Sequence, residues 1–288
     1  MPIGIPSGTA KLQPPREAPT VIEKRRATVL DIEKLAAPGH YVLTFDAGHQ
    51  MAASVTPGQF LGVAMDTGGT QFLRRPFSFY SADPQTGHAS ILFSVYGAST
   101  ALMAKLTPGD TLDIIGPLGG KSFTPDARSG AHHVMVGGGY GIPPLAFLSR
   151  RLRATNPHSY VTLINGARTA DFLVGTEGLE EIGVHLHETT NDGSRGTQGL
   201  VTAVLQEILE ARAEHAPVHV YTCGPTPMMQ AVAKMAMEYH VPCQVSMEVF
   251  MPCGVGICMG CAVERTDGVF ARGCTDGPVF EAREVAWK

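Results

Sequence analysis

The sequence predicts three folded parts in chain order: an antiparallel β-barrel, an α/β domain with a doubly wound parallel sheet, and a small cysteine-rich C-terminal domain. Short apolar stretches separated by turn residues fill the first part, and strand-like and helical stretches alternate in the second. Four of the six cysteines lie between Cys253 and Cys274. We expect a flexible, Pro/Gly-rich extension over residues 1–20 and the three domains over residues 21–128, 129–246 and 247–288.

The barrel is predicted by apolar stretches that recur roughly every 8–12 residues, which is typical of all-β domains. Turn signals containing Pro-Gly lie between them at 37–39, 56–58 and 107–109. The predicted strands are 27–32, 41–45, 59–64, 77–80, 90–95 and 111–115, with one helix over 100–106.

The α/β domain is predicted by the change of pattern after residue 129, because alternating strands and helices favour a parallel sheet. The predicted strands are 133–136, 161–164, 184–187, 218–222 and 243–249. The predicted helices are 145–152, Val201–Ala211 and 228–238.

Composition excludes several classes of protein. The chain has 288 residues, of which 44% are hydrophobic, so it can bury substantial cores. With 22 Lys and Arg against 26 Asp and Glu it has no excess positive charge for a nucleic acid partner. No apolar run approaches the roughly 18 residues of a membrane span, and the first 20 residues contain no hydrophobic signal segment. We therefore expect a cytoplasmic protein.

The glycine-rich run at residues 137–144 lies between a predicted strand and a predicted helix. Glycines allow close backbone approach, and the free amides of a helix start attract a pyrophosphate. Pro143 and Pro144 fit a first helical turn, where an amide has no intrahelical partner. The run departs from the full G-x-G-x-x-G pattern, so dinucleotide binding and an ordinary strand-to-helix turn both stay open.

The four clustered cysteines have the spacing Cys253-x4-Cys258-x2-Cys261-x12-Cys274. Thiolates bind zinc or iron–sulfur clusters, and C-x4-C-x2-C with a distant fourth cysteine is the plant-type [2Fe–2S] arrangement. The spacing favours a [2Fe–2S] cluster, with structural zinc, disulfides or free thiols as the alternatives.

A basic and hydroxyl-containing element, Arg74-Arg75-Pro76-Phe77-Ser78, leads into a barrel strand. Arginine with a nearby hydroxyl is a phosphate-binding pair, although solvated surface arginines and a core phenylalanine explain it equally. A Ser/Thr pair at 99–100 precedes the predicted helix and suggests a second anion site.

The order of these motifs resembles the ferredoxin–NADP reductase superfamily, in which a flavin-binding barrel precedes a pyridine-nucleotide domain. The motifs are 75–78, 97–100, 116–119, 137–144 and Cys223-Gly224-Pro225 with Met228. The cysteine array followed by 276–280 narrows the resemblance to the electron-transfer subunits of two-component, NAD-dependent dihydroorotate dehydrogenases. It covers about residues 22–282.

The resemblance implies three bound groups: FAD, NAD and a [2Fe–2S] cluster. Arg75 and Ser78 would hold flavin phosphate and ribityl groups, Pro76 and Phe77 would line the isoalloxazine, and Thr100 and its neighbours would hold the pyrophosphate. The remaining implied cofactor residues are Leu92, Phe93, Ser94, Ser99, Gly138, Gly139, Gly141, Cys223, Gly224 and Pro225, and the implied cluster ligands are Cys253, Cys258, Cys261 and Cys274. Ser94 stands where the family commonly has an arginine, and Ser99 where it commonly has a glycine.

The implied activity is that of an oxidoreductase subunit in pyrimidine biosynthesis. Electrons would pass from dihydroorotate through the flavin of an FMN-containing catalytic subunit, the [2Fe–2S] cluster and FAD to NAD+, within a heterotetramer. We predict no general acid or base from the sequence. NAD is favoured over NADP by the resemblance, while Arg168 after the second strand is placed to face either a ribose 2′-phosphate or solvent.

Two other functions remain open. One is the flavin and [2Fe–2S] subunit of another NAD(P)H-linked complex, such as a ferredoxin oxidoreductase or a hydrogenase, which differs only in its partner. The other is a zinc-stabilised binding protein without a redox role, which cofactor content would distinguish.

Overall fold

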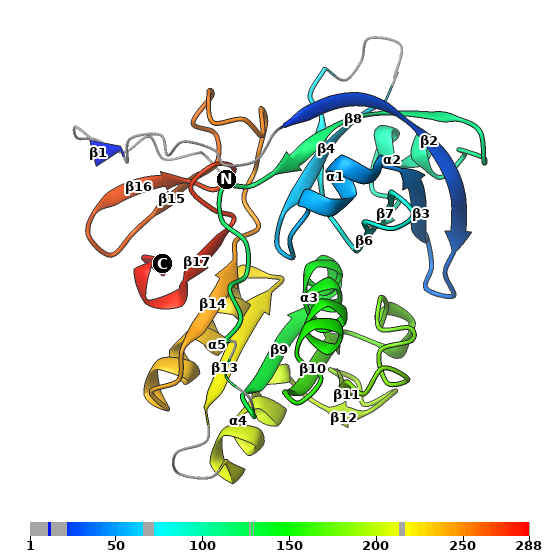
Figure 1. Ribbon diagram of the computed structural model, residues 1–288. Helices are drawn as coiled ribbons and strands as arrows, with labels where there is room; N and C mark the ends of the chain where they lie inside the picture. The colour runs from blue at the N-terminus through cyan, green and yellow to red at the C-terminus, as the bar shows by residue number, and fades with distance from the viewer. Residues whose placement is uncertain are drawn as a thin grey trace.

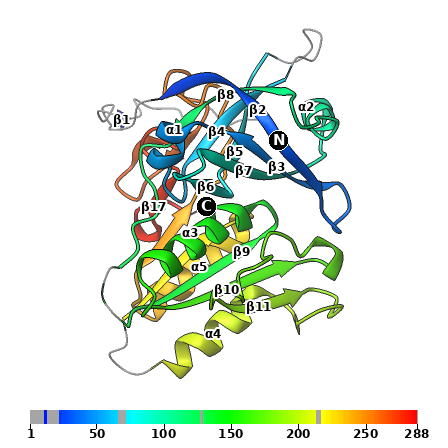
Figure 2. The ribbon, with the colours of Figure 1, turned by 45° about the vertical axis from the view of Figure 1, so that its right-hand side comes forward.

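The computed structural model describes residues 11–12, 22–65, 72–126, 128, 130–212 and 217–287. These residues form two seven-stranded sheets and one three-stranded sheet. Figures 1 and 2 show the first sheet above the second, with helix α3 (Ile142–Thr155) at the junction and the C-terminal strands at one side. The predicted fold class is confirmed. No helix within the described ranges is both long and apolar enough to span a bilayer.

The first sheet is antiparallel and strongly curved. Its strands, in the order β5-β4-β8-β2-β3-β7-β6, are β2 (Glu23–Lys34), β3 (His40–Asp46), β4 (Phe60–Ala64), β5 (Arg75–Ser78), β6 (Ser81–Asp83), β7 (His88–Ser94) and β8 (Thr111–Leu118). The rings of Phe77 on β5 and Phe93 on β7 meet edge to face, 6.2 Å apart, so the sheet curls back on itself. Residues such as Val29, Phe45, Ile91 and Ile114 fill its interior.

The predicted barrel strands all have counterparts, but their limits differ. The expected strand 77–80 is part of β5, which ends at Ser78, and a separate strand β6 follows. Helix α2 covers Ala98–Met103 rather than 100–106, because the chain enters a turn in which Thr107 donates its backbone amide to Asp110. Helix α1 (His49–Ser54) was not predicted, and its six residues are too few for a clear helical period.

The second sheet is parallel apart from its last strand. Its order is β12-β11-β10-β9-β13-β14-β17, with β9 (His132–Gly138), β10 (Tyr160–Ala167), β11 (His185–Thr190), β12 (Thr197–Gln198), β13 (Val218–Cys223) and β14 (Cys243–Ser246). The chain runs outward from β9 to β11 and returns to place β13 on the other side of β9. Strands β9 and β13 therefore form the switch point, where ligands of such sheets bind at the carboxyl ends.

Helices cover both faces of this sheet. Val134 and Val136 of β9 pack with α4 (Val201–Ala211) and α5 (Thr226–Glu238), whereas Met135 between them packs with α3. This alternation along one strand shows that both faces are buried, as in a doubly wound fold.

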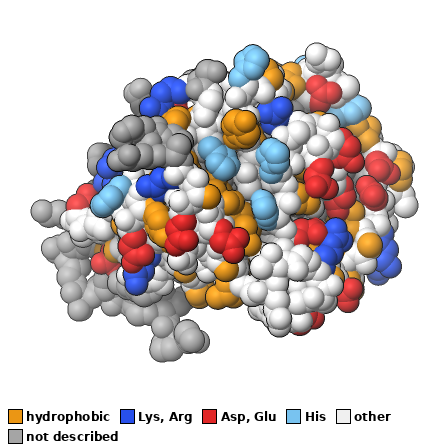
Figure 3. All heavy atoms as spheres, turned by 90° about the horizontal axis from the view of Figure 1, so that it is seen from below, with side chains coloured by type: hydrophobic (Ala, Val, Ile, Leu, Met, Phe, Trp, Pro, Cys, Tyr) orange, Lys and Arg blue, Asp and Glu red, His pale blue; other side chains and the backbone are white. Residues whose placement is uncertain are grey.

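Histidines gather at the amino ends of the parallel strands, the end of the domain away from the barrel (Figure 3). His133 is fully buried and lies 6.2 Å from the ring of His219. His219 pairs with Asp126 at 2.7 Å. Burial, with repulsion from His219, lowers the pKa of His133 to about 4.

The C-terminal part contains β15 (Ala262–Glu264), β16 (Val269–Arg272), β17 (Val279–Glu281) and the short 3-10 helix η3 (Ala282–Glu284). Strand β16 pairs with β15, and also with β1 (Lys11–Leu12), which lies within the expected flexible extension. Strand β17 joins the second sheet by pairing antiparallel with β14. The expected strand 243–249 ends at Ser246, where pairing with β17 stops and a loop leads to the cysteines.

Candidate functional site

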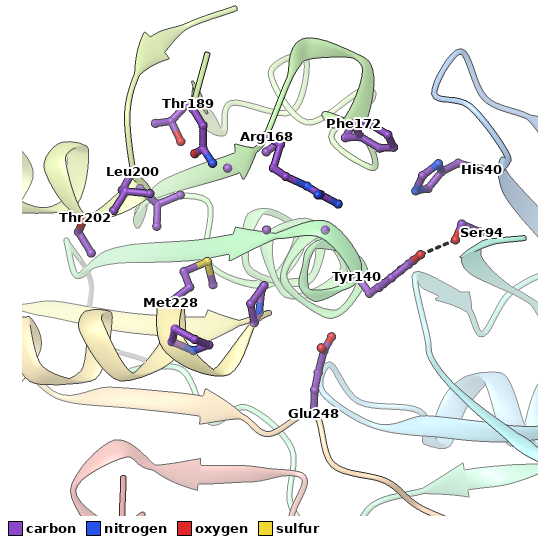
Figure 4. Close-up of a pocket in the computed structure, with 18 of the residues that line it drawn as sticks. His40, Ser94, Tyr140, Arg168, Phe172, Thr189, Leu200, Thr202, Met228 and Glu248 are labelled. Carbon is purple, nitrogen blue, oxygen red and sulfur yellow. Dashed lines mark hydrogen bonds between the residues drawn. The ribbon is translucent and has the colours of Figure 1, made fainter. Parts of the chain in front are cut away.

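A cavity of about 710 Å³ lies at the carboxyl ends of β9, β10 and β11, as expected for a switch point (Figure 4). The predicted residues Gly138, Gly139 and Pro225 line it. Arg168, which follows β10, also lines it, and Figure 4 shows its side chain extending into the cavity. The cavity wall thus combines glycine backbone with mostly apolar and aromatic side chains, and Arg168 is the one arginine among the described residues that line it.

The glycine loop approaches neighbouring strand ends so closely that two of its residues have no room for a side chain. A Cβ on Gly141 would lie 1.9 Å from the carbonyl oxygen of Cys223, and one on Gly138 would lie 2.9 Å from that of Gly166. The loop forms a short 3-10 helix, η1 (Gly139–Gly141), and continues into α3, with proline in the first turn. Gly141 therefore brings two strand ends together without lining the cavity itself.

A second cavity, of about 400 Å³, lies between the barrel, the glycine loop and the loop after β14. The predicted flavin residues that line it are Pro76, Phe77, Ser78, Leu92, Phe93, Ser94, Thr100 and Cys223. Apolar and aromatic walls with a few hydroxyl groups suit a flat, polar-edged ring system.

Besides Gly141, three predicted residues line neither cavity. Arg75 donates a hydrogen bond to the carbonyl oxygen of Leu73 at 2.9 Å and is not part of the cavity wall. Ser99 is buried in α2, and Gly224 packs against Met228, so neither lines a cavity. Thr100 does line the second cavity, but its hydroxyl accepts hydrogen bonds from the amides of Tyr96 and Gly97 and so orders that loop.

The two cavities share four lining residues, Ser94, Tyr96, Tyr140 and Glu248, which we call the doorway. Tyr140 and Ser94 form a hydrogen bond along one side of it, between the α/β domain and the barrel (Figure 4). Glu248 faces the space inside the cavities, and desolvation by the surrounding protein raises the pKa of its carboxyl group. The sequence did not predict Tyr96, Tyr140 or Glu248 as site residues: Tyr96 and Glu248 belong to no motif, and Tyr140 lies in the glycine-rich run, where only the glycines were expected to meet a ligand.

Cys223, at the end of β13, forms part of the floor of the second cavity. Its side chain is buried, and this burial raises the pKa of the thiol, which stays neutral. It supplies a compact, uncharged surface where the two cavities approach each other.

The cysteine loop brings its four thiols together in two pairs. The sulfur atoms of Cys261 and Cys274 are 3.3 Å apart, and Cys253 interacts with the thiol of Cys258. The hydrogen bond from Cys274 lowers the pKa of Cys261 to about 6. Burial opposes ionisation of Cys253, but backbone amides pointing at its sulfur lower its pKa to about 7. The described residues contain no set of three such side chains already spaced around a metal ion.

These thiols fit an iron–sulfur cluster because backbone amides surround them. Gly254 and Gly256 have positive φ angles of 70° and 83°, and Met259 adopts 59°, so the loop turns its amides inward. Such amides stabilise negative charge on sulfur. The buried Asp276 accepts a hydrogen bond from the backbone amide of Arg272 and pairs with its guanidinium at 3.0 Å, which fixes the segment containing Cys274.

Three family models match the chain. Residues 30–123 match the oxidoreductase FAD-binding domain, and residues 135–234 match the oxidoreductase NAD-binding domain. Residues 248–286 match the iron–sulfur cluster binding domain of dihydroorotate dehydrogenase B. The cofactors FAD and NAD and the iron–sulfur cluster are thus assigned to the three parts that the geometry separates.

Curated relatives match over nearly the whole chain. The dihydroorotate dehydrogenase B (NAD(+)) electron transfer subunit of Bacillus caldolyticus is 36% identical, over 92% of this chain and 99% of that protein. The subunit of the same name from Caldanaerobacter subterraneus subsp. tengcongensis is 38% identical, over 91% and 98%.

Solved structures share the fold. The structure of an NADH-dependent reduced ferredoxin–NADP oxidoreductase superposes with a TM-score of 0.77 at 28% identity, over 91% of this chain and 90% of that one. A ferredoxin–NADP+ reductase from Neisseria gonorrhoeae with bound FAD and NADP gives a TM-score of 0.58 at 16% identity, over 75% and 91%.

Proposed function

Because the chain belongs to the family of dihydroorotate dehydrogenase B (NAD+) electron transfer subunits, we propose that it passes electrons from a catalytic subunit, through an iron–sulfur cluster and FAD, to NAD+. One observation carries this proposal: the three candidate sites adjoin in that order. Met251 packs against Cys261 and Cys274 and also lines the second cavity, which meets the first cavity at the doorway.

The second cavity is the flavin site in this proposal. A flavin converts between hydride transfer and single-electron transfer, which is the chemistry needed between a nicotinamide and an iron–sulfur cluster. Pro76, Phe77 and Leu92 would hold the ring system through apolar contact, and Ser78 would meet its polar edge. Cys223 would separate it from the nucleotide site without adding charge.

The first cavity would hold the dinucleotide. The backbone of Gly138 and Gly139 would face its pyrophosphate, where the start of α3 also favours negative charge. Arg168 would contribute an ionic contact, since no hydrogen bond or ion pair ties its side chain to another residue in the described ranges. Pro225 and Glu248 would lie beside the nicotinamide, next to the doorway.

Reduction of NAD+ to NADH consumes two electrons and one proton, whereas electrons delivered through a metal cluster bring no proton. A protonatable group beside the doorway would supply this proton where the rings meet. Glu248 is the acidic side chain that lines both cavities, and its raised pKa keeps it protonated to higher pH than an ordinary carboxyl group. We propose that its carboxyl group holds this proton.

The catalytic partner would supply dihydroorotate oxidation and dock beside the cysteine loop. Cys258 is exposed there, and Phe250 and Ile257 are 71% and 82% exposed. Short distances favour electron transfer, so a partner covering these side chains would be well placed. We propose a heterotetramer of two electron-transfer and two catalytic subunits.

The first experiment is an absorption spectrum of protein purified without oxygen, repeated after addition of NADH and then of NADPH. We expect flavin bands with superimposed broad iron–sulfur absorption, bleached far better by NADH. A colourless, zinc-containing protein under the same conditions would overturn the proposal.

A second candidate differs only in the partner. The 28% identity to a reduced ferredoxin–NADP oxidoreductase over 91% of the chain favours a subunit of that type of complex. Co-purification from the native organism decides between them: a partner that oxidises dihydroorotate supports the first function, and a partner that oxidises ferredoxin supports the second.

A further inference from the structure

The doorway determines whether nicotinamide and flavin rings can meet, and this inference rests on the proposed function. Hydride transfer requires the two rings to be in contact, because small misplacements slow such reactions strongly. Ser94 and Tyr140 lie on one side of the doorway, and Glu248 lies across from Tyr140 (Figure 4). Whatever fixes the Tyr140 side chain therefore sets the width of the opening.

The backbone of Tyr140 cannot shift toward β13. Its neighbour Gly141 already touches the carbonyl group of Cys223, and α3 begins immediately afterwards. The variable part of this loop is consequently the Tyr140 side chain, whose ring can rotate while the loop stays in place.

Two contacts hold this ring on the barrel side. Its hydroxyl group forms a hydrogen bond with the Oγ atom of Ser94, and its ring stacks on His40, with centroids 6.3 Å apart and planes 23° apart. His40 is itself only 8% exposed, and its Nδ1 atom is 2.9 Å from the carbonyl oxygen of Pro38. Tyr140 is 51% exposed as a residue, so packing alone restrains its side chain weakly.

We propose that Tyr140 is a positioning residue whose tether to Ser94 holds its ring clear of the doorway, so that a nicotinamide ring can enter between Tyr140 and Glu248. The tether joins the two domains at the point where their ligands meet. Without it, the ring rotates into the opening and competes with the nicotinamide ring for that space.

The test compares Tyr140→Phe, Ser94→Ala and the double variant in the full-length protein loaded with its cofactors. Tyr140→Phe keeps the ring and removes the hydroxyl, and Ser94→Ala removes the partner. We expect each single variant to lower the limiting rate of flavin reduction by NADH about fivefold, the effect of one lost hydrogen bond. The charge-transfer absorbance of stacked nicotinamide and flavin rings should fall in parallel, whereas the calorimetric Kd for NAD+ changes less than about threefold.

The double variant provides the decisive comparison, because two residues that act through one hydrogen bond have non-additive effects. It should match either single variant. Tyr160→Phe, at the far end of β10, is the matched control and should behave as the wild type. The proposal would be overturned if the effects of the two substitutions on the rate of flavin reduction multiplied in the double variant. It would also be overturned if both single variants kept the wild-type charge-transfer absorbance and rate. If the wild type itself binds no dinucleotide, the proposed function fails, and that outcome is visible before any variant is made.

Discussion

The glycine loop after β9 and the cysteine loop after β14 present backbone amides to a ligand in different ways. The glycine loop is three residues long and is held between a buried strand and a 14-residue helix. The cysteine loop has no regular structure between Ser246 and Ala262 and depends on positive φ angles at Gly254, Gly256 and Met259. The first loop is therefore shaped by the strand and helix on either side of it, and the second by its own glycine-containing backbone.

The largest effect is expected from loss of one cluster ligand. Cys274→Ser should abolish cluster binding, lowering iron from about two atoms per chain to nearly none, because four thiolates hold such a cluster. Iron analysis and the visible spectrum measure this. The control is Cys243→Ala, in which a buried thiol of β14 outside the loop is removed and iron content should be unchanged. Equal iron in Cys274→Ser and the wild type would show that this cysteine is no ligand.

The glycine loop, in contrast, should be sensitive to the volume of an added side chain. In Gly141→Ala the new methyl group would lie 1.9 Å from the carbonyl oxygen of Cys223, so a strand end must move. We expect a loss of about 3 kcal/mol in the free energy of unfolding and a marked weakening of NADH binding. Denaturant titration and calorimetry measure the two quantities.

Gly139→Ala is the matched variant two residues earlier. Gly139 has φ +56° and nothing within 4 Å of its Cβ position, so only backbone strain of about 1 kcal/mol is expected. If Gly141→Ala proved as mild as Gly139→Ala, the close approach of the two strand ends would not be rigid.

The amino end of β9, the strand that leads into the glycine loop, contains His133, and the stability of the protein should depend on pH through this residue. His133 has a folded pKa of about 4, below its usual value, so the unfolded chain binds the proton more readily. Neutral His133 therefore contributes fully to the free energy of unfolding above about pH 6.5. As the pH falls toward 4, the free energy of unfolding decreases by about 2–3 kcal/mol. His133→Leu should flatten this part of the curve of melting temperature against pH. An unchanged curve would assign the acid sensitivity to other groups.

The smallest effect is expected at Arg168, which is exposed at the cavity wall. Arg168→Gln should weaken dinucleotide binding about fivefold at low salt, because an exposed ionic contact contributes about 1 kcal/mol. The difference should shrink as ionic strength rises. Titration with NADH and NADPH shows whether the loss is greater for the dinucleotide with the 2′-phosphate.

The sequence predicted those features of the molecule that depend on residues close to one another in the chain. Cysteine spacing and strand periodicity each depend on neighbouring residues, and they predicted the fold class and favoured an iron–sulfur cluster, whereas FAD and NAD were implied by the family resemblance of the ordered motifs. Ser94 was predicted, but its place in the doorway with Tyr140 and Glu248 could not be, because the end of β7, the 3-10 helix η1 and the loop after β14 are far apart in the sequence. Arg75 lies outside the cavity wall and donates a hydrogen bond to the carbonyl oxygen of Leu73, a contact that no motif encodes.

Strand β17 ties the last part of the chain to the sheet that begins more than a hundred residues earlier. Phe280 within it packs into the same core as α4 and α5. A truncation before the cysteines would therefore leave β14 as a bare sheet edge and uncover that core, conditions under which proteins aggregate. The metal-binding segment is not a detachable module: a nucleotide-binding fragment for engineering has to retain β17 or replace it with another edge strand.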